Sequence, residues 1–186
     1  MSISQKNQHA GTLSPEFALL GFLMAGPSHG YDLHQRVVSE LGHIWHLSQS
    51  QAYAILKRLE NHGDISVKIV EQEKLPARQF LHITAQGRRH FDEWMGEVSV
   101  NARSIRLEFL TRLYFARIYR PEQVAQIHNA QCAEIKLTIE RLESLLANLP
   151  PEQQFNQLSL NLRLRQMKLI QEWIREVKTK IFDSKE

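Results

Sequence analysis

The hydrophobic pattern of this chain changes its period between residues 65 and 83, and this change limits the folds that the chain can adopt. Apolar residues recur every second position over residues 65–70, which is typical of a β-strand. Residues 71–77 interrupt the alternation and residues 79–83 resume it, so we expect a β-hairpin with a long tip. Before and after the hairpin, the apolar residues recur every three or four positions, which indicates helices.

Three helices are expected before the hairpin. The first begins at Ser14 and Pro15, where the serine can cap a helix whose first turn holds the proline, and it ends before residues 26–27. Its body is nearly all apolar, so we expect it to be buried on most sides. Ser28 can cap the second helix, over residues 29–41. The apolar side of the second helix comprises Tyr31, Leu33, Val37, Val38 and Leu41.

The third and fourth helices have clearer start signals. Residues 43–47 are short, apolar and β-leaning, and they lead to Ser48 and Gln51, which have the spacing of a capping box. A third helix is therefore expected over residues 49–62, with Gly63 after it. Thr84 can cap a fourth helix, whose apolar side comprises Phe91, Trp94, Met95 and Val98. Three helices, a hairpin and a helix follow one another in the order of a winged helix-turn-helix.

Beyond residue 100 the pattern is helical throughout. Helices are expected over residues 107–114, 135–149 and 153–182, and Pro150-Pro151 separates the last two. The last helix carries two apolar stripes, and one protomer can hardly cover both, so the pattern predicts a coiled-coil-like homodimer. The second stripe holds Leu158, Leu162, Leu169 and Trp173. We expect the dimer contacts at Leu160, Leu164, Met167, Ile170, Trp173, Ile174, Val177 and Ile181.

Composition limits the size of the protein and the kind of partner. The 186 residues suffice for one compact unit with an extension. The net charge is only +3, but a pI near 9.1 tolerates a polyanionic partner if the positive charge is concentrated where that partner lies. No apolar run is long enough for a membrane span, the start of the chain lacks a secretory signal, and Cys132 is the lone cysteine, so we expect a cytoplasmic protein. The expected fold is mainly α with a small β-hairpin. Its parts are a flexible N-terminal segment (1–13), a winged helix-turn-helix domain (14–99) and a helical dimerisation domain (100–182).

The third helix has the form of a DNA recognition helix. Its first turn presents Gln49, Ser50 and Gln51, whose short polar side chains suit hydrogen bonds to base edges in a major groove. Lys57 and Arg58 could hold phosphates of the DNA backbone. The alternative interpretation is a solvated amphipathic helix in which Gln51 serves only its own cap. The hairpin favours the first interpretation, because Lys74 and Arg78 at its tip are suited to a wing that contacts DNA. Glu71 and Glu73 in the same tip limit that contact.

Several motifs resemble the PadR family of transcriptional regulators, and they occur in the family's order. They are residues 26–33 (GPSHGYDL), 48–63 (SQSQAYAILKRLENHG), 76–80 (PARQF), 83–87 (ITAQG) and 106–117 (RLEFLTRLYFAR). The resemblance covers residues 14–95 closely, and Phe80 departs from it where a tyrosine is more usual. It implies a dimer in which C-terminal helices embrace the partner, and it places Tyr31 and Tyr53 near DNA phosphates.

Other interpretations of single residues point away from DNA. Residues 26–30 match the Gly-x-Ser-x-Gly elbow of hydrolases, but that elbow needs a preceding strand in a parallel sheet, and the expected flank is a helix. His43 and His46 form the tightest histidine pair, without a recognised metal-ligand spacing, so no metal and no cofactor are expected. A redox role for Cys132 would need an activating environment.

Two further sets of residues leave alternatives open. Trp45 and Trp94 either pack in the core or line a pocket for an aromatic effector. Five arginines are opposed only by Glu108, and they form either a solvated or interprotomer charged face or a DNA contact: Arg103, Arg106, Arg112, Arg117 and Arg120.

Two function classes follow from the sequence. The first is a non-enzymatic, sequence-specific regulator of transcription that binds double-stranded DNA as a homodimer, represses from a pseudo-palindromic operator and responds to a small-molecule effector. The second is a helical adaptor that uses its winged-helix domain to bind another protein.

Overall fold

The structure, a computed structural model, describes residues 13, 15–72 and 75–182, and of residues 70–72, 75–78 and 182 the backbone alone. The chain divides into two compact units, Met1–Glu97, here called the head, and Val98–Glu186, here called the arm. The expected flexible N-terminal segment lies, apart from Leu13, outside the described residues, and so does the expected cap Ser14.

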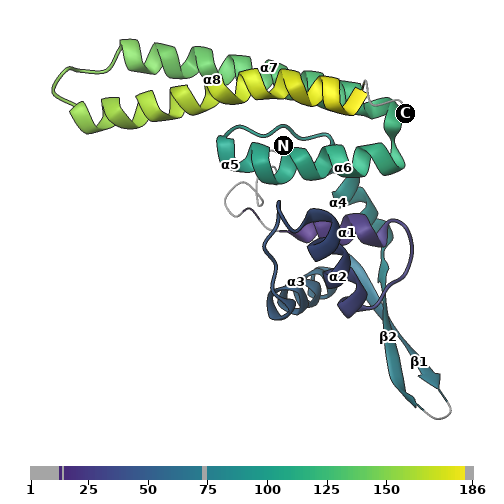
Figure 1. Ribbon diagram of the computed structural model, residues 1–186. Helices are drawn as coiled ribbons and strands as arrows, with labels where there is room; N and C mark the ends of the chain where they lie inside the picture. The colour runs from purple at the N-terminus through teal and green to yellow at the C-terminus, as the bar shows by residue number, and fades with distance from the viewer. Residues whose placement is uncertain (1–12, 14, 73–74, 183–186) are drawn as a thin grey trace, which may run out of the picture. The chain divides into compact units, whose positions relative to one another are not determined.

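The head consists of three helices, a two-stranded antiparallel hairpin and a fourth helix (Figure 1). Its elements are α1 (Glu16–Leu23), α2 (Gly30–Leu41), α3 (Gln49–Asn61), β1 (Ile65–Gln72), β2 (Leu75–Ile83) and α4 (Ala85–Met95). The expected mainly α fold with a small hairpin is confirmed. The core of the head is apolar, and it includes Leu19, Leu20, Phe22, Leu23, Leu33, Val37, Leu41, Trp45, Leu56, Leu59, Ile65, Phe91 and Trp94.

Two of the expected helix starts in the head are confirmed. At α3 the Gln51 backbone N–H donates to Ser48 Oγ, and the Ser48 backbone N–H donates to Gln51 Oε1, so the capping box is complete. At α4 the Gly87 N–H donates to Thr84 Oγ1 over 3.0 Å. Gly63 follows α3 with a φ of 78°, a left-handed conformation that glycine adopts without a steric cost.

The other two helix starts differ from expectation. Pro15 occupies the N-cap position of α1 rather than its first turn. Ser28 does not cap α2, because α2 begins at Gly30 and His29 occupies its N-cap position. The Ser28 backbone forms an isolated antiparallel bridge with Leu81 of β2, with N···O distances of 3.2 and 2.9 Å. This bridge fastens the turn between α1 and α2 to the hairpin.

The strands of the hairpin are longer, and its tip is shorter, than the sequence pattern predicted. Ile65 pairs with Ile83, and the ladder continues to Gln72 and Leu75, with a register shift between Val70 and Gln72. Backbone pairing needs no apolar alternation, so the polar ends of the strands gave no period-two signal. The apolar, β-leaning residues 43–47 form a turn and irregular structure.

One close approach in the head requires glycine. A Cβ at Gly87 would lie 2.1 Å from the Asp64 carbonyl oxygen, which is backbone and cannot move aside. The same oxygen accepts hydrogen bonds from the Thr84 N–H and the Thr84 hydroxyl. The start of α4 therefore packs directly on the segment between α3 and β1.

All the regular secondary structure in the described part of the arm is helical. Its elements are α5 (Ala102–Ser104), the π-helix η1 (Ile105–Phe109), α6 (Leu110–Tyr119), the 3-10 helix η2 (Pro121–Gln123), α7 (Val124–Ala147) and α8 (Gln154–Phe182). The long helices α7 and α8 lie side by side and run in opposite directions (Figure 1). The break at Pro150-Pro151 is confirmed. No helix in the described part of the chain combines the length and apolar character of a membrane span.

Three residues of the first stripe of α8 are buried within their own chain. Met167 is 4% exposed, Ile174 is 1% exposed and Val177 is also buried. The buried face of α7, which lies beside α8, is also apolar and includes Ile135, Ile139 and Leu142. Met167, Ile174 and Val177 are therefore core residues of one protomer rather than partner contacts. The other predicted contacts of this stripe are half-buried and stay predictions: Leu160, Leu164, Ile170 and Ile181.

The second stripe of α8 remains exposed in the single chain. Leu158, Leu162 and Leu169 are 66%, 59% and 66% exposed, and Phe155 is more exposed still. Trp173, at the end of this stripe, is half-buried. The sequence-based expectation that one protomer cannot cover both stripes is met by this burial pattern.

Arg112 is a second correction in the arm. It was expected on a charged surface, but its side chain is completely buried, whereas Arg103, Arg106 and Arg117 are exposed. The burial of α6 on most sides explains the error, because Thr111, Leu113, Phe115 and Ala116 are buried as well. In a helix that is buried nearly all round, the period does not tell which positions face solvent.

Three further positions were misassigned from periodicity. Val98 was expected on the apolar side of α4, but α4 ends at Met95, and Val98 is partly exposed and belongs to the arm. Tyr31 and Val38, both expected on the apolar side of α2, are about half exposed.

Candidate nucleic-acid interface

The first turn of α3 presents three polar side chains to solvent. Gln49, Ser50 and Gln51 are all exposed, while Ala52, Ile55 and Leu56 on the opposite face are buried in the head. The capping box at Ser48 fixes the direction in which this turn leaves the preceding loop. The turn is therefore both accessible and held in one conformation.

The capping box divides the three side chains by their remaining capacity for hydrogen bonds. Gln51 Oε1 accepts the Ser48 N–H over 2.9 Å, so the cap uses one lone pair of its carbonyl and fixes the side chain toward Ser48. Adenine recognition by glutamine needs both the carbonyl and the amide of one side chain. Ser50 Oγ lies 3.1 Å from Ser48 Oγ and can still bond a base. Gln49 and Ser50 are thus better placed than Gln51 to bond base edges.

Tyr31, Tyr53 and Lys57 meet at one groove of about 680 Å³ in the head. The start of α2, the middle of α3 and the hairpin form its walls, and the two tyrosines are 52% and 48% exposed. Lys57 Nζ is 2.9 Å from Glu60 Oε2, an exposed pair that costs little to separate. Two phenol hydroxyls and an ammonium group at one groove can donate hydrogen bonds to an anionic oxygen.

Two residues that shape this groove were not singled out from the sequence. A Cβ at Gly30 would lie 3.0 Å from Tyr53 Cε1, so the bare backbone of Gly30 lets the tyrosine ring approach. His29 Nδ1 is 2.8 Å from the Gln79 carbonyl oxygen, and its ring centroid is 4.0 Å from that of Phe80. The sequence indicated a turn at residues 26–30. The contacts of this turn with α3 and β2 join distant segments, so they produce no periodic pattern in the sequence.

Arg58 contacts another part of the head rather than extending into solvent. Its Nε and Nη2 atoms donate to Glu16 Oε1 over 3.0 and 2.6 Å, which links α3 to the start of α1. A guanidinium held in this way stabilises the packing of α1 on α3. The structure thus gives Arg58 a second interaction that competes with its predicted role at phosphates.

The side chains of the two predicted wing residues lie outside the described part of the chain. Lys74 lies outside the described residues. Arg78 pairs through its backbone with Val70, and its side chain is outside the described part. Both stay predicted DNA contacts.

The two tryptophans proposed for an effector pocket are buried in the head. Trp94 stacks on Phe17 with a centroid distance of 4.8 Å and also contacts Phe91. Trp45 follows α2 and is more than nine-tenths buried. Of the two interpretations that the sequence left open, packing in the core describes their surroundings.

A sequence comparison identifies the family to which this head belongs. Residues 19–93 match the model of the family described as the transcriptional regulator PadR-like family. Residues 19–93 of this chain therefore form a PadR-like domain. The matched region begins in α1 and ends in α4, and so it includes α3, the groove and the hairpin. The resemblance inferred from the sequence motifs is confirmed.

The similarity of this chain to individual PadR proteins is low in sequence identity. The negative transcriptional regulator PadR of Bacillus subtilis (strain 168) is 24% identical over 140 residues, which cover 73% of this chain and 77% of that protein. The crystal structure of Bacillus subtilis PadR in complex with operator DNA is 23% identical with a TM-score of 0.45, and the match covers 89% of this chain and 98% of that one. Bacillus subtilis PadR in complex with p-coumaric acid is 21% identical with a TM-score of 0.41, and the match covers 90% and 94%. The match of residues 19–93 to the family carries the assignment.

The remaining chemical motifs have different surroundings in this PadR-like regulator. The hydrolase-like sequence at residues 26–30 follows a helix, and Ser28 pairs through its backbone with Leu81. Among the described residues, no group of three or more histidine, cysteine or acidic side chains is arranged to hold a metal ion. Burial raises the pKa of the Cys132 thiol, against the smaller effects of Lys178 and Arg175. A raised pKa keeps the thiol protonated at neutral pH, which is unfavourable for a redox switch.

Proposed function

We propose that this PadR-like regulator binds a pseudo-palindromic operator as a homodimer and represses transcription by excluding the polymerase from an overlapping promoter. The observation that carries the proposal is the exposed first turn of α3 beside the groove of Tyr31, Tyr53 and Lys57. One feature is suited to base edges and the other to backbone phosphates, and a recognition helix needs both.

Gln49 and Ser50 read the bases in this proposal. They lie at the N-terminal end of α3, which is the part of a recognition helix that enters the major groove. Gln49 is suited to adenine, because its carboxamide offers a donor and an acceptor side by side. Gln51 contributes to the rigidity of the turn through its cap, which already uses one lone pair of its carbonyl oxygen and fixes the direction of its side chain.

Tyr31, Tyr53 and Lys57 hold a phosphate in this proposal. The groove between α2, α3 and the hairpin is bordered by hydroxyl and ammonium donors, while Glu60 pairs with Lys57 when DNA is absent. An exposed ion pair contributes about 0–1 kcal/mol, so a phosphate can displace the glutamate. Lys74 and Arg78 would add wing contacts to the neighbouring backbone.

A second copy of this chain is the proposed occupant of the exposed stripe on α8. Leu158, Leu162 and Leu169 are large apolar side chains spaced at four and seven residues, the spacing of a seam between paired helices. A two-fold axis lets each protomer offer the same stripe to its partner, so one exposed face suffices for a closed dimer. The dimer then presents two heads to two half-sites.

A small-molecule effector would act on this regulator by changing the separation of the two heads. Bacillus subtilis PadR has been solved with p-coumaric acid, so phenolic acids are suitable first probes. The proposed role takes place in the cytoplasm, where the operator is accessible, and it uses no catalytic residue and no cofactor. Release of a bound operator duplex by a phenolic acid is the expected result, and unchanged DNA affinity across a panel of such acids would remove this part of the proposal.

Selection of bound sites from random DNA, followed by footprinting at several salt concentrations, tests the proposal. We expect an inverted repeat whose half-sites are about one helical turn apart, and a footprint that persists at moderate salt. Binding without sequence preference that disappears at moderate salt would contradict it. In that case the adaptor function, in which the head binds a protein, becomes the better explanation.

A further inference from the structure

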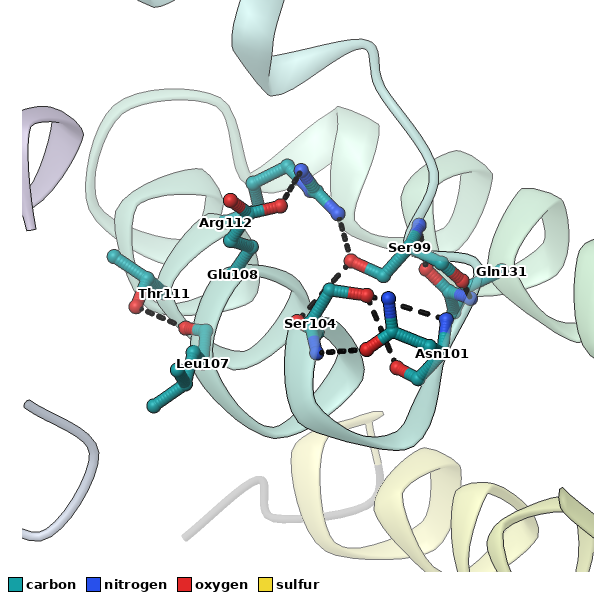
Figure 2. A network of polar contacts seen from close by, with 8 residues as sticks. All are labelled: Ser99, Asn101, Ser104, Leu107, Glu108, Thr111, Arg112 and Gln131. Carbon is teal, nitrogen blue, oxygen red and sulfur yellow. Dashed lines mark hydrogen bonds and ion pairs between the residues drawn. The ribbon is translucent and has the colours of Figure 1, made fainter. Parts of the chain in front are cut away.

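The most elaborate polar contact in the arm is centred on Ser99, close to the point where the chain passes from head to arm. Figure 2 shows the residues around it. The Ser99 N–H donates to Gln131 Oε1 over 2.8 Å, and Gln131 Nε2 donates to the Ser99 carbonyl oxygen over 2.6 Å. Arg112 Nη2 donates to Ser99 Oγ over 2.5 Å, and Ser99 Oγ donates to the Ser104 carbonyl oxygen over 3.2 Å. We call Ser99, Ser104, Arg112 and Gln131 the Ser99 clamp.

The side chain of Gln131 pairs with the backbone of Ser99 as a residue of a neighbouring strand would. Its carboxamide presents one acceptor and one donor, and these satisfy both backbone groups of Ser99, as a paired residue in an antiparallel ladder would. Gln131 is on α7 and is buried, so water does not compete for these bonds. The connecting segment is thereby fixed to the long helical hairpin of the arm.

Arg112 fixes the same residue from α6. Its side chain is completely buried and reaches the Ser99 hydroxyl, while Nη1 lies 3.8 Å from Glu108 Oε2 on the preceding turn. Immediately after the clamp, Asn101 Oδ1 accepts the Ser104 N–H over 2.9 Å and starts α5. The clamp and this cap together define one path for the chain at the beginning of the arm (Figure 2).

The tether that remains between the two units is short. The last helix of the head, α4, ends at Met95, and the clamp holds Ser99, so only residues 96–98 lie between them. Three residues restrict the volume that a head can explore when the clamp is closed. If Ser99 were released, residues 96–100 would lie between Met95 and the cap at Asn101, so the tether would grow from three residues to five.

We propose that Gln131 and Arg112 are positioning residues for operator recognition, because they fix the point at which each head is attached to the dimer. This inference rests on the proposed function, a dimer that binds two half-sites. Once one head is bound, the effective concentration of the second at its half-site depends on the length and stiffness of its tether. The clamp raises that concentration without touching DNA, so its loss weakens binding to two half-sites and leaves binding to one half-site unchanged.

The test compares two DNA probes with the full-length protein. The probes are the duplex selected by the wild-type protein from random DNA and a duplex that carries one of its half-sites. For Gln131→Leu, we expect the affinity for the full duplex to fall at least tenfold and the affinity for the half-site to stay within twofold. Gln126→Leu, at an exposed position of the same helix, is the matched control and should change neither affinity.

Ser99→Ala gives a milder second variant that keeps both backbone bonds to Gln131 and loses those of the hydroxyl. We expect about a threefold fall in the affinity for the full duplex alone, and this variant decides the matter if Gln131→Leu does not fold. Sedimentation of each variant as a dimer separates positioning from loss of the dimer. An equal loss on both probes, or no loss on either, would overturn the role of the clamp. Failure of the wild-type protein to select an inverted repeat would instead overturn the proposed function.

Discussion

The head and the arm differ in how completely each buries its own apolar residues. In the head, α1 is enclosed by α2, α3 and α4, and its leucines are buried. In the arm, α8 buries one stripe against α7 and leaves a second stripe of leucines exposed. The head is complete as a single chain, whereas the arm has an apolar face that one chain cannot cover. The difference suggests that the head needs a partner only for function and that the arm needs one for stability.

The largest expected effect comes from a charge in the exposed stripe. Leu162→Glu removes about 1.5–3 kcal/mol of leucine burial from each protomer, and symmetry counts the loss twice in a dimer. We expect dimer affinity to fall at least 100-fold, together with the affinity for the full operator. Sedimentation equilibrium measures the dimer affinity.

Gln157→Glu, on another face of the same helix, is the control and should leave the dimer intact. A dimer of wild-type stability for Leu162→Glu would show that the stripe is not the interface. A point variant is cleaner than removal of α8, because removal would also uncover the buried face of α7.

The second test shows whether the head is stable by itself. Gly87→Ala places a Cβ 2.1 Å from the Asp64 carbonyl oxygen, and we expect the head to lose about 1–3 kcal/mol of stability from this overpacking. Chemical denaturation in a Trp173→Phe background measures the loss, because the two remaining tryptophans, Trp45 and Trp94, are both in the head. Gly96→Ala is the matched control, since its new Cβ would be 3.4 Å from the Glu93 carbonyl oxygen. Equal stability of the two variants would contradict the packing of α4 described above.

The third test concerns sequence readout by the head. Gln49→Ala removes the side chain with the most free hydrogen-bonding capacity in the first turn of α3, so we expect discrimination at one base position in each half-site to fall by about 1–3 kcal/mol. Competition between the selected operator and its single-base variants measures this change. If Gln51→Ala relaxes the sequence specificity and Gln49→Ala does not, then Gln51 contacts the base in spite of its role in the capping box.

The smallest effects separate two neighbouring cations of α3. Lys57→Ala should lower affinity for all sequences by a similar factor and reduce the salt dependence by about one phosphate contact. Arg58→Ala should mainly lower the stability of the head, by less than about 1 kcal/mol, because its partner Glu16 is on α1 and the pair is half exposed. A reduced salt slope for Arg58→Ala would show that DNA displaces Glu16 from the arginine.

The head was more predictable from sequence than the arm, for physical reasons. Caps such as Ser48 and Thr84 act within a few residues, so their signal is local, and the buried faces of the helices repeat at a regular period. The contacts of Ser28 with Leu81 and of Gly30 with Tyr53 join distant segments and left no period. In the arm, the periodicity located α8 and its two stripes, but it could not decide which stripe α7 covers. Because α6 is buried on most of its sides, its apolar period did not reveal the buried position of Arg112.

The stoichiometry of the complex with DNA tests the central claim most directly, namely that an arm with an uncovered stripe brings two heads to one operator. Wild-type protein is titrated against the selected duplex in sedimentation experiments at moderate salt, with a scrambled duplex of equal length for comparison. We predict two chains on each selected duplex and no stable complex on the scrambled one. One chain per duplex, or equal binding to both duplexes, would contradict the account.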